Sequence, residues 1–175
     1  IYAKMMTVAL VMLEIASEYQ LEALQLARLA EAMLSYVDNP IKVIRRLRKS
    51  CSTFFVRMIS YPELYYHTIM ALEDGYPTRL NIGPRGVPGL WDKFVNYNRT
   101  AATSAMKKLN PGANSLGSGK QWDEYPYAST IQGGDGASVM LVSSDQNQRH
   151  GADLKDHYKI NNMRLGDCFY VIPIL

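Results

Sequence analysis

The sequence is poor in cysteine. Cys51 and Cys168 are the only two among 175 residues. This is too few for a framework of several disulfides, and it also excludes a zinc site built from cysteines. One bridge between them is possible but cannot be inferred from the sequence. Free, buried cysteines are the simpler interpretation, and they would allow a reducing compartment.

Long apolar runs and nucleotide-binding loops are also missing. The longest apolar run near the start, residues 5–13, is well short of the roughly 20 residues that span a bilayer, so we expect no transmembrane segment. The glycines of residues 112–119 are too loosely spaced for a phosphate-binding loop, and no Gly-Lys-Ser/Thr follows them. No zinc-finger spacing or recognition helix predicts the reading of bases.

The composition is that of an ordinary globular protein, with 47% hydrophobic and 20% charged residues. Because the chain begins with Ile1, we expect a processed product or part of a longer polypeptide. Charge is uneven: residues 36–60 carry six bases against one acid, and residues 123–175 carry seven acids against four bases. This division would suit a protein in which acids hold a cation and bases hold phosphates. A solvated basic helix face is the alternative.

The first part of the chain is predicted to be helical. Apolar residues at helical spacing predict helices over residues 2–35, 41–59 and 62–72, the last capped by Ser60. These helices either form a core or bind a partner. His67 lies beside two tyrosines in the third helix, and we expect a surface or core histidine there, not a ligand.

A connection rich in proline and glycine divides the chain. Residues 75–89 contain three prolines and four glycines and are predicted to be a loop. We therefore expect a helical N-terminal region over residues 1–74 and a second domain over residues 90–175. The second domain is predicted to begin with a helix over 91–109.

The chemistry is concentrated in residues 121–128, Gln-Trp-Asp-Glu-Tyr-Pro-Tyr-Ala. Asp123 and Glu124 are adjacent, and adjacent buried carboxylates repel each other unless they are solvated or bind a cation. Pro126 fixes its own φ and biases Tyr125 toward an extended conformation, so the two acids are predicted to lie outside a helix. Spacing alone leaves two alternatives, an acidic loop with aromatic packing or a cation site.

Shorter elements are predicted after the acids. We expect an extended segment over residues 128–131, a turn over 133–136 and a strand over 138–142. A helix over 146–158, capped by Ser144 or Asp145, and a final strand over 168–174 complete the chain.

This order of motifs resembles that of the NucA/NucB-type secreted deoxyribonucleases, roughly over residues 99–171. The resemblance is carried by Asp123-Glu124-Tyr125-Pro126-Tyr127-Ala128, by Gly133-Gly134-Asp135-Gly136-Ala137-Ser138-Val139 and by Ser144-Asp145-Gln146-Asn147. It implies an α+β fold, in which the helical N-terminal half precedes a small antiparallel sheet and a ββα-metal-finger-like nuclease core. It also implies a metal-dependent endonuclease that hydrolyses DNA with little sequence preference. Magnesium or manganese suits oxygen ligands, whereas zinc would need more histidine or cysteine.

The resemblance also implies roles for individual residues. Asp123 and Glu124 form the central pair, one acting as general base and the other as metal ligand or orienting group, with the order left open. The site that follows has catalytic Asp123, Glu124 and His150, metal-binding Glu124, Asn147 and Asp145, and substrate-binding Arg99, Lys107, Lys120, Gln132 and Arg149.

The third motif departs from the family. Gln146 and His150 stand where many relatives carry Glu and Gln, the segment is one residue longer than in other relatives, and Gln132 replaces a frequent Glu. Either Asp145 takes over the acidic role, or His150 contributes as base or ligand, or the site is weakened. A helix-surface imidazole is the alternative for His150.

Three hypotheses about function follow. The first is a secreted or delivered DNA-degrading enzyme, the nuclease end of a toxin with a cognate immunity protein. The second is a catalytically impaired protein that keeps the nuclease fold for binding. The third, compatible with both, is an interaction module in residues 1–72.

Overall fold

The computed structural model of the chain describes residues 50–87, 89–109 and 119–175. The helix predicted over residues 2–35, the first part of the helix predicted over 41–59 and the basic residues at 42–49 lie outside the described residues. So do residues 110–118. These predictions stay predictions.

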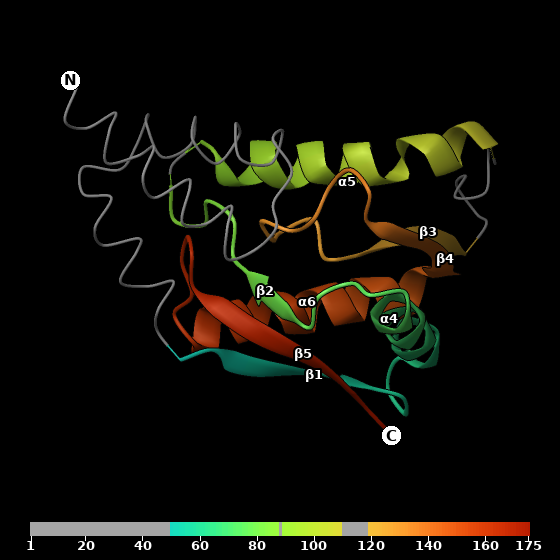
Figure 1. Cartoon of the computed structure of the whole chain (residues 1–175), viewed down its shortest axis with the longest axis horizontal. Helices are drawn as coiled ribbons and strands as arrows, with labels where there is room; N and C mark the ends of the chain where they lie inside the picture. Colours follow the sequence, from blue (N-terminus) through green and yellow to red (C-terminus); the bar gives the residue numbers. More distant parts are fainter. Residues whose placement is uncertain (1–49, 88, 110–118) are drawn as a thin grey trace.

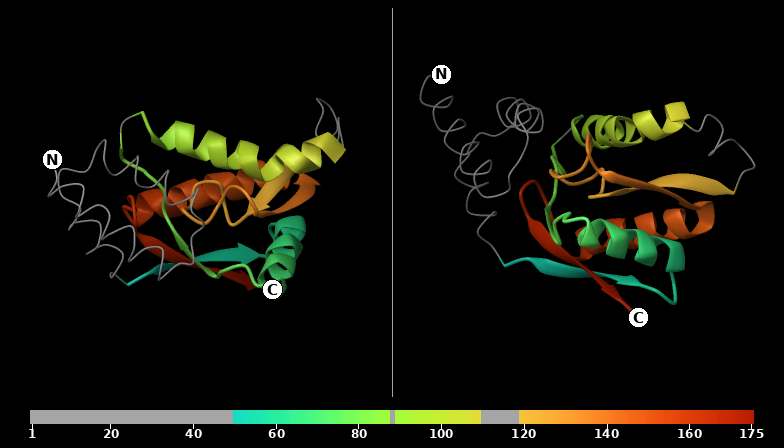
Figure 2. Two further views of the ribbon diagram at one scale, coloured as in Figure 1. Left: turned by 45° about the horizontal axis from the view of Figure 1, so that its top comes forward. Right: turned by 45° about the vertical axis from the view of Figure 1, so that its right-hand side comes forward.

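The described elements stack as alternating layers of helix and sheet (Figures 1 and 2). Helix α5 covers one face of the two-stranded sheet β3–β4, and α4 and α6 cover the other. Beneath α4 and α6 lies a three-stranded sheet of β1, β5 and β2. The elements are, in chain order, β1 (Ser52–Arg57), α4 (Pro62–Glu73), β2 (Arg79–Asn81), α5 (Trp91–Leu109), β3 (Lys120–Tyr125), β4 (Ser138–Ser143), α6 (Ser144–Ile160) and β5 (Cys168–Ile174).

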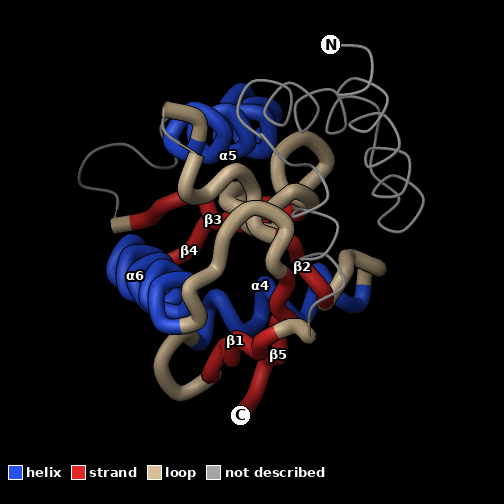
Figure 3. Tube along the Cα trace, turned by 90° about the vertical axis from the view of Figure 1, so that its left-hand side faces the viewer, coloured by secondary structure: helices blue, strands red, loops and turns tan. Residues whose placement is uncertain are grey.

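Strand β5 is the middle strand of the three-stranded sheet. It pairs in parallel with β1 on one side and antiparallel with β2 on the other, and Figure 3 shows β1 and β5 side by side. The final strand predicted over residues 168–174 is confirmed. Because β2 lies inside residues 75–89, the prediction that this whole segment is a loop was wrong.

Strand β1 corrects the helix predicted over residues 41–59. Residues 52–57 form a strand in which Phe54 and Val56 are buried while Thr53, Phe55 and Arg57 are exposed. This alternation has the period of two that a strand requires. The apolar pattern therefore belonged to a strand whose partner, β5, lies more than a hundred residues further along the chain.

The β3–β4–α6 unit has the ββα order that the resemblance implies. The two strands are antiparallel, with Asp123 opposite Met140 and Glu124 opposite Val139. The predicted helices over 62–72, 91–109 and 146–158 and the strand over 138–142 are confirmed. Residues 128–131 form a turn with an isolated bridge at Thr130, so the extended segment predicted there was wrong.

The predicted helix caps were also wrong. Tyr61 and Ser143 occupy the N-cap positions of α4 and α6, and neither makes a side-chain capping hydrogen bond. Glu63 replaces a conventional cap for α6, because its Oε2 accepts a 3.0 Å hydrogen bond from the Ser143 amide.

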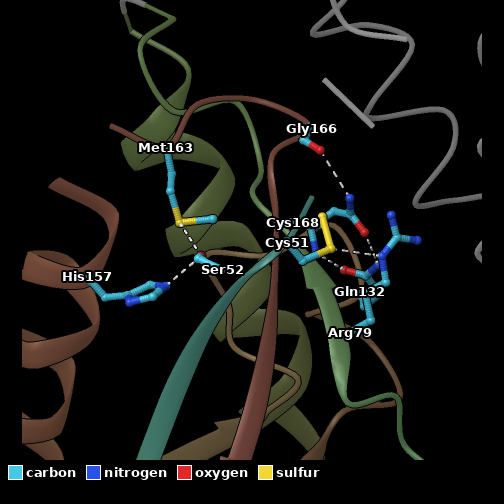
Figure 4. Close-up of a disulfide and its surroundings, with 9 residues drawn as sticks. Cys51, Ser52, Arg79, Gln132, His157, Met163, Gly166 and Cys168 are labelled. Atoms are coloured by element: carbon cyan, nitrogen blue, oxygen red, sulfur yellow. Dashed lines mark hydrogen bonds between the residues drawn. A yellow bond between two sulfur atoms is a disulfide. The ribbon is translucent and has the colours of Figure 1, made fainter. Parts of the chain in front are cut away.

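A disulfide joins Cys51 to Cys168, so the expectation of free cysteines was wrong. It links the residue before β1 to the first residue of β5 (Figure 4). Arg79 Nε donates a 3.2 Å hydrogen bond to Cys51 Sγ, and Ser52 Oγ lies 3.0 Å from His157 Nε2 of α6. The start of β1 is therefore bound to β5, β2 and α6 at once.

The hydrophobic core fills the space between the α4–α6 layer and the three-stranded sheet. Its fully buried members include Val56, Leu64, Leu80, Phe169 and Val171. The core residues come from both before and after residue 90. In the described part of the chain, no helix combines the length and apolarity needed to cross a membrane.

Candidate active site

Asp123 and Glu124 are both buried on β3, with 7% and 8% of their surface exposed. Consecutive side chains leave a strand on opposite faces, and the contacts of the two acids follow this rule. Asp123 contacts His67 of α4, and Glu124 faces Arg99 of α5. Among the described strands β3 pairs with β4 alone, so the acids flank an open strand edge.

A cleft of about 690 Å³ runs along this part of the molecule, and both acids line it. Every fourth residue of α5 faces it, because residues four apart share one side of a helix: Trp91, Val95, Arg99, Thr103 and Lys107. The α6 wall combines spacings of three and four residues, which also share one side of a helix, and it includes Asn147, His150, Gly151, Leu154 and Tyr158. The residues of β3 and the turn after it lie between these walls.

Asp123 is held by a histidine that the sequence did not mark as part of the site. His67 Nδ1 lies 2.6 Å from Asp123 Oδ2, and His67 Nε2 lies 3.0 Å from Ser138 Oγ. His67 is 2% exposed and does not line the cleft. Of the two predicted alternatives, a surface or a core histidine, the structure shows the core histidine, and its contact with Asp123 places it directly behind the site.

Glu124 lies in a setting that disfavours its charge. Burial, together with the neighbouring Asp123 carboxylate, raises the pKa of Glu124 to about 7, against the opposing effect of Arg99 and Lys107. Its Oε1 is buried and has no hydrogen-bond partner among the described residues; Arg99 Nε is 3.7 Å away. A bound cation would offset both the burial of the Glu124 charge and the lack of a partner for Oε1, since it favours the ionised carboxylate and binds the free oxygen.

His150 is buried among aromatic rings. Its ring centroid lies 5.4 Å from those of Phe54 and Tyr61 and 5.6 Å from that of Tyr127. Burial lowers the pKa of His150, against the opposing charges of Asp123 and Asp153. The side chain is therefore a neutral imidazole in the wall of the cleft, and not the helix-surface imidazole that was the alternative.

The start of α6 decides which residue of the third motif reaches the cleft. Asn147 lines it, and its Nδ2 donates hydrogen bonds to Gln121 Oε1 and to the Trp122 carbonyl at 3.4 and 3.3 Å. The amide oxygen is thus the atom left to act as a ligand. Asp145 is exposed and pairs with Arg149 at 2.8 Å, so the structure does not bring it to the other acids.

Gln146 has a structural contact in place of an acidic role. Its Oε1 accepts from the Glu63 amide at 3.0 Å, and its Nε2 donates to Glu63 Oε1 at 3.3 Å. A glutamate at position 146 would set a second carboxylate against Glu63. The glutamine that departs from the family motif at this position therefore links α6 to α4 through hydrogen bonds to Glu63.

The arrangement just described suits phosphodiester hydrolysis: two carboxylates and an amide on a ββα unit, in a cleft bordered by cations. Comparison with known families agrees, because residues 92–172 match the family model of deoxyribonuclease NucA/NucB. The C-terminal half is a NucA/NucB domain. A search of the curated proteins gave no match.

The NucA/NucB domain indicates a deoxyribonuclease, a hydrolase whose substrate is DNA. The match begins in α5 and ends within β5. Strands β1 and β2 and helix α4 lie before it, yet they supply His67 behind Asp123 and Phe54 beside His150. The site of the NucA/NucB domain is therefore completed by residues from outside the matched segment.

The Gly-Gly turn of the NucA/NucB domain has a steric explanation. A Cβ on Gly133 would lie 2.2 Å from the Tyr127 carbonyl oxygen. Gly134 has a φ of +111°, which other residues rarely adopt, and it packs against Asn98. Asn98 Nδ2 in turn donates to the Ala128 carbonyl at 3.0 Å. These glycines let the turn pack closely against Asn98 and against Tyr127 and Ala128, and the last two residues line the cleft.

The predicted substrate-binding residues divide into two groups. Arg99 and Lys107 line the cleft, as do Arg85 and Lys155, which the sequence did not single out. The other three predicted residues, Lys120, Gln132 and Arg149, are not among the lining residues. Lys120 pairs with Glu63 at 2.9 Å, and Gln132 hydrogen-bonds to Asn81 at both ends of its amide.

The residues of the NucA/NucB domain fit a partly hydrated cation. Among the described residues no group of three or more His, Cys, Asp or Glu side chains is gathered into a metal site. Magnesium usually takes one or two carboxylates and completes its shell with water and substrate phosphate. The free Oε1 of Glu124 and the amide oxygen of Asn147 are suitable ligands of this kind.

Proposed function

We propose that the protein is a metal-dependent endonuclease that hydrolyses DNA phosphodiester bonds with little sequence preference. The single observation that carries the proposal is the buried Oε1 of Glu124, which has no hydrogen-bond partner in the described residues and faces a cleft bordered by cations. These features support a site that binds a cation and a phosphate together. The match to the NucA/NucB family supports DNA as the substrate.

Glu124 and Asn147 would hold a magnesium or manganese ion. When bound, the ion supplies stabilisation of negative charge on the phosphate and on the departing oxygen. Zinc is disfavoured because the candidate ligands are oxygen atoms.

The residues of the chain perform the remaining steps. Arg99 and Lys107 bind phosphates on the α5 side of the cleft. Asp123 takes a proton from the attacking water at Oδ1, because its Oδ2 is already bound to His67. His150, as a neutral imidazole, is the second candidate to accept this proton. The sequence left open which acid is the base and which is the ligand, and we assign Asp123 as base and Glu124 as ligand.

The proposed setting is an oxidising compartment, reached by secretion or by delivery into a target cell. The disulfide supports this, because such bonds persist mainly outside reducing cytosol. A toxin role and an immunity protein are part of the same proposal. Co-purification of the full chain with the product of a neighbouring gene, and loss of nuclease activity in that complex, would support an immunity protein; unchanged activity would count against it.

Plasmid cleavage tests the proposed activity. Wild type, Asp123→Asn and Glu124→Gln are incubated with supercoiled DNA in EDTA, magnesium or manganese, after circular dichroism has shown that each is folded. We expect relaxed and then linear product from the wild type with metal only, and at least a hundredfold loss in both variants. Intact plasmid under every condition would instead favour the catalytically impaired binding protein.

A further inference from the structure

We infer that His67 is a positioning residue of the nuclease, which holds the Asp123 carboxylate in the orientation that the reaction needs. The inference rests on the proposed function of Asp123 as general base. It concerns a residue of α4, which lies before the segment matched by the NucA/NucB family.

Both ring nitrogens of His67 are engaged. A carboxylate only accepts hydrogen bonds, so Nδ1 carries the hydrogen that is shared with Asp123 Oδ2 at 2.6 Å. Nε2 shares a second hydrogen bond with the Ser138 hydroxyl at 3.0 Å. The imidazole cannot rotate without losing both bonds, and its orientation therefore sets that of the carboxylate.

The two ends of this chain of hydrogen bonds differ in their surroundings. Asp123 lines the cleft, whereas His67 does not. His67 therefore acts through Asp123 and does not touch the substrate. With Oδ2 fixed from behind, the second oxygen of Asp123 is the one available to the water that attacks the phosphate.

A histidine that merely fills the core would not need this arrangement. Met140, opposite Asp123 on β4, offers no hydrogen bond to fix a carboxylate. Asp123 also stands next to the buried Glu124, so a carboxylate free to rotate would have no single position. Displacing a reacting group by about 1 Å can cost on the order of a hundredfold in rate.

Two substitutions of His67 separate positioning from packing. The side-chain nitrogen of asparagine occupies the place of Nδ1, and that of glutamine occupies the place of Nε2. His67→Asn thus keeps the donor to Asp123 and loses the bond to Ser138, while His67→Gln does the reverse. The two variants are compared with wild type in full-length protein by steady-state cleavage of a labelled duplex with manganese, and by thermal unfolding.

We expect His67→Gln to lower kcat by about a hundredfold with KM within about twofold of wild type. His67→Asn should keep kcat within about tenfold of wild type and restore most of what His67→Gln loses. Equal kcat for wild type and a folded His67→Gln would overturn the inference, and so would equal losses in the two variants that follow their melting temperatures.

Ser138→Ala carries the test if both His67 variants melt below the assay temperature. It leaves the bond to Asp123 but frees the ring, so kcat should fall several-fold with KM unchanged; an unchanged kcat would overturn the inference. If the wild type cleaves DNA and these variants cleave it equally well, the inference about His67 fails but the proposed function stands. A wild-type protein that leaves DNA intact defeats the proposed function, and this inference with it.

Discussion

Arg99 and Glu124 face each other across the cleft, with the arginine Nε 3.7 Å from the glutamate Oε1. The arginine comes from α5 and is more than half exposed, whereas the glutamate is buried on β3. The contact is too long for a hydrogen bond, and it leaves the buried oxygen unsatisfied. Glu124 can therefore exchange its contact with Arg99 for a contact with a cation at little cost. In the same way, Arg99 can exchange Glu124 for a phosphate.

The bases in the cleft are expected to govern DNA binding. Arg99→Gln and Lys107→Gln should each raise KM by about threefold to tenfold and reduce the slope of log KM against log salt by about 1, because each removes one phosphate contact. Arg149→Gln is the matched control, since Arg149 lies outside the cleft and pairs with Asp145. Initial rates across a salt series measure all three. Equal effects from Arg149→Gln and Arg99→Gln would argue against this cleft as the DNA-binding site.

The raised pKa of Glu124 predicts a pH-dependent stability in the absence of metal. A carboxyl group whose pKa rises from 4.5 to about 7 on folding binds more protons in the folded state between these values. The free energy of unfolding therefore falls as pH rises through this window. Glu124→Gln stays neutral, so in EDTA it should be more stable than wild type at pH 8 by on the order of 2–3 kcal/mol, and equally stable at pH 4.

Urea unfolding at pH 4 and pH 8 measures this difference. Glu73→Gln is the control, because Glu73 is exposed at the end of α4 and its substitution should leave stability unchanged at both pH values. A gap between wild type and Glu124→Gln that is the same at pH 4 and pH 8 would show that the cause is not ionisation.

Asn147, and not Asp145, is expected to contribute to metal binding. Asn147→Ala should raise the manganese concentration needed for half-maximal activity by about tenfold to a hundredfold, as expected for the loss of a ligand oxygen or of its support. Asp145→Asn should leave it unchanged, because Asp145 is exposed and lies away from the cleft. Metal titrations of the cleavage rate test both variants. The reverse result would mean that the acidic role in α6 belongs to Asp145.

Removing the disulfide should weaken the whole fold. The double substitution Cys51→Ser and Cys168→Ser is expected to lower the free energy of unfolding by about 2–5 kcal/mol, because the bond closes a long stretch of chain. Neither cysteine lines the cleft, so kcat below the melting temperature should stay close to wild type. Denaturant unfolding with and without reductant gives the measurement. A reduced wild type as stable as the oxidised protein would contradict the prediction.

The sequence predicted the elements whose signals are local. Helices α5 and α6 carry long periodic patterns, and Pro126 kept the acids of β3 outside a helix. Prediction from the sequence failed where the conformation of a segment depends on a strand that is distant in the chain. Phe54, Phe55 and Val56 suit a helix or a strand equally well, and only the pairing with β5 makes them a strand.

The same limit applied to the site. Asp123, Glu124, Asn147 and His150 could be selected because they cluster in recognisable motifs. His67 could not, because its contact with Asp123 spans 56 residues and depends on how α4 packs beneath β3. Gln132 stands where relatives frequently carry Glu, and Lys120 lies next to the acidic block. Neither lines the cleft, and each hydrogen-bonds to a residue distant in the sequence, Gln132 to Asn81 and Lys120 to Glu63.

The place of β5 in the middle of its sheet has a consequence for synthesis. Neither β1 nor β2 can pair until residues 168–174 have left the ribosome, because β5 is the strand that both require. A nascent chain that stops short of β5 lacks the centre of that sheet and the partner of Cys51. Folding of this sheet must therefore await contacts between distant parts of the chain, and a topology of this kind slows folding.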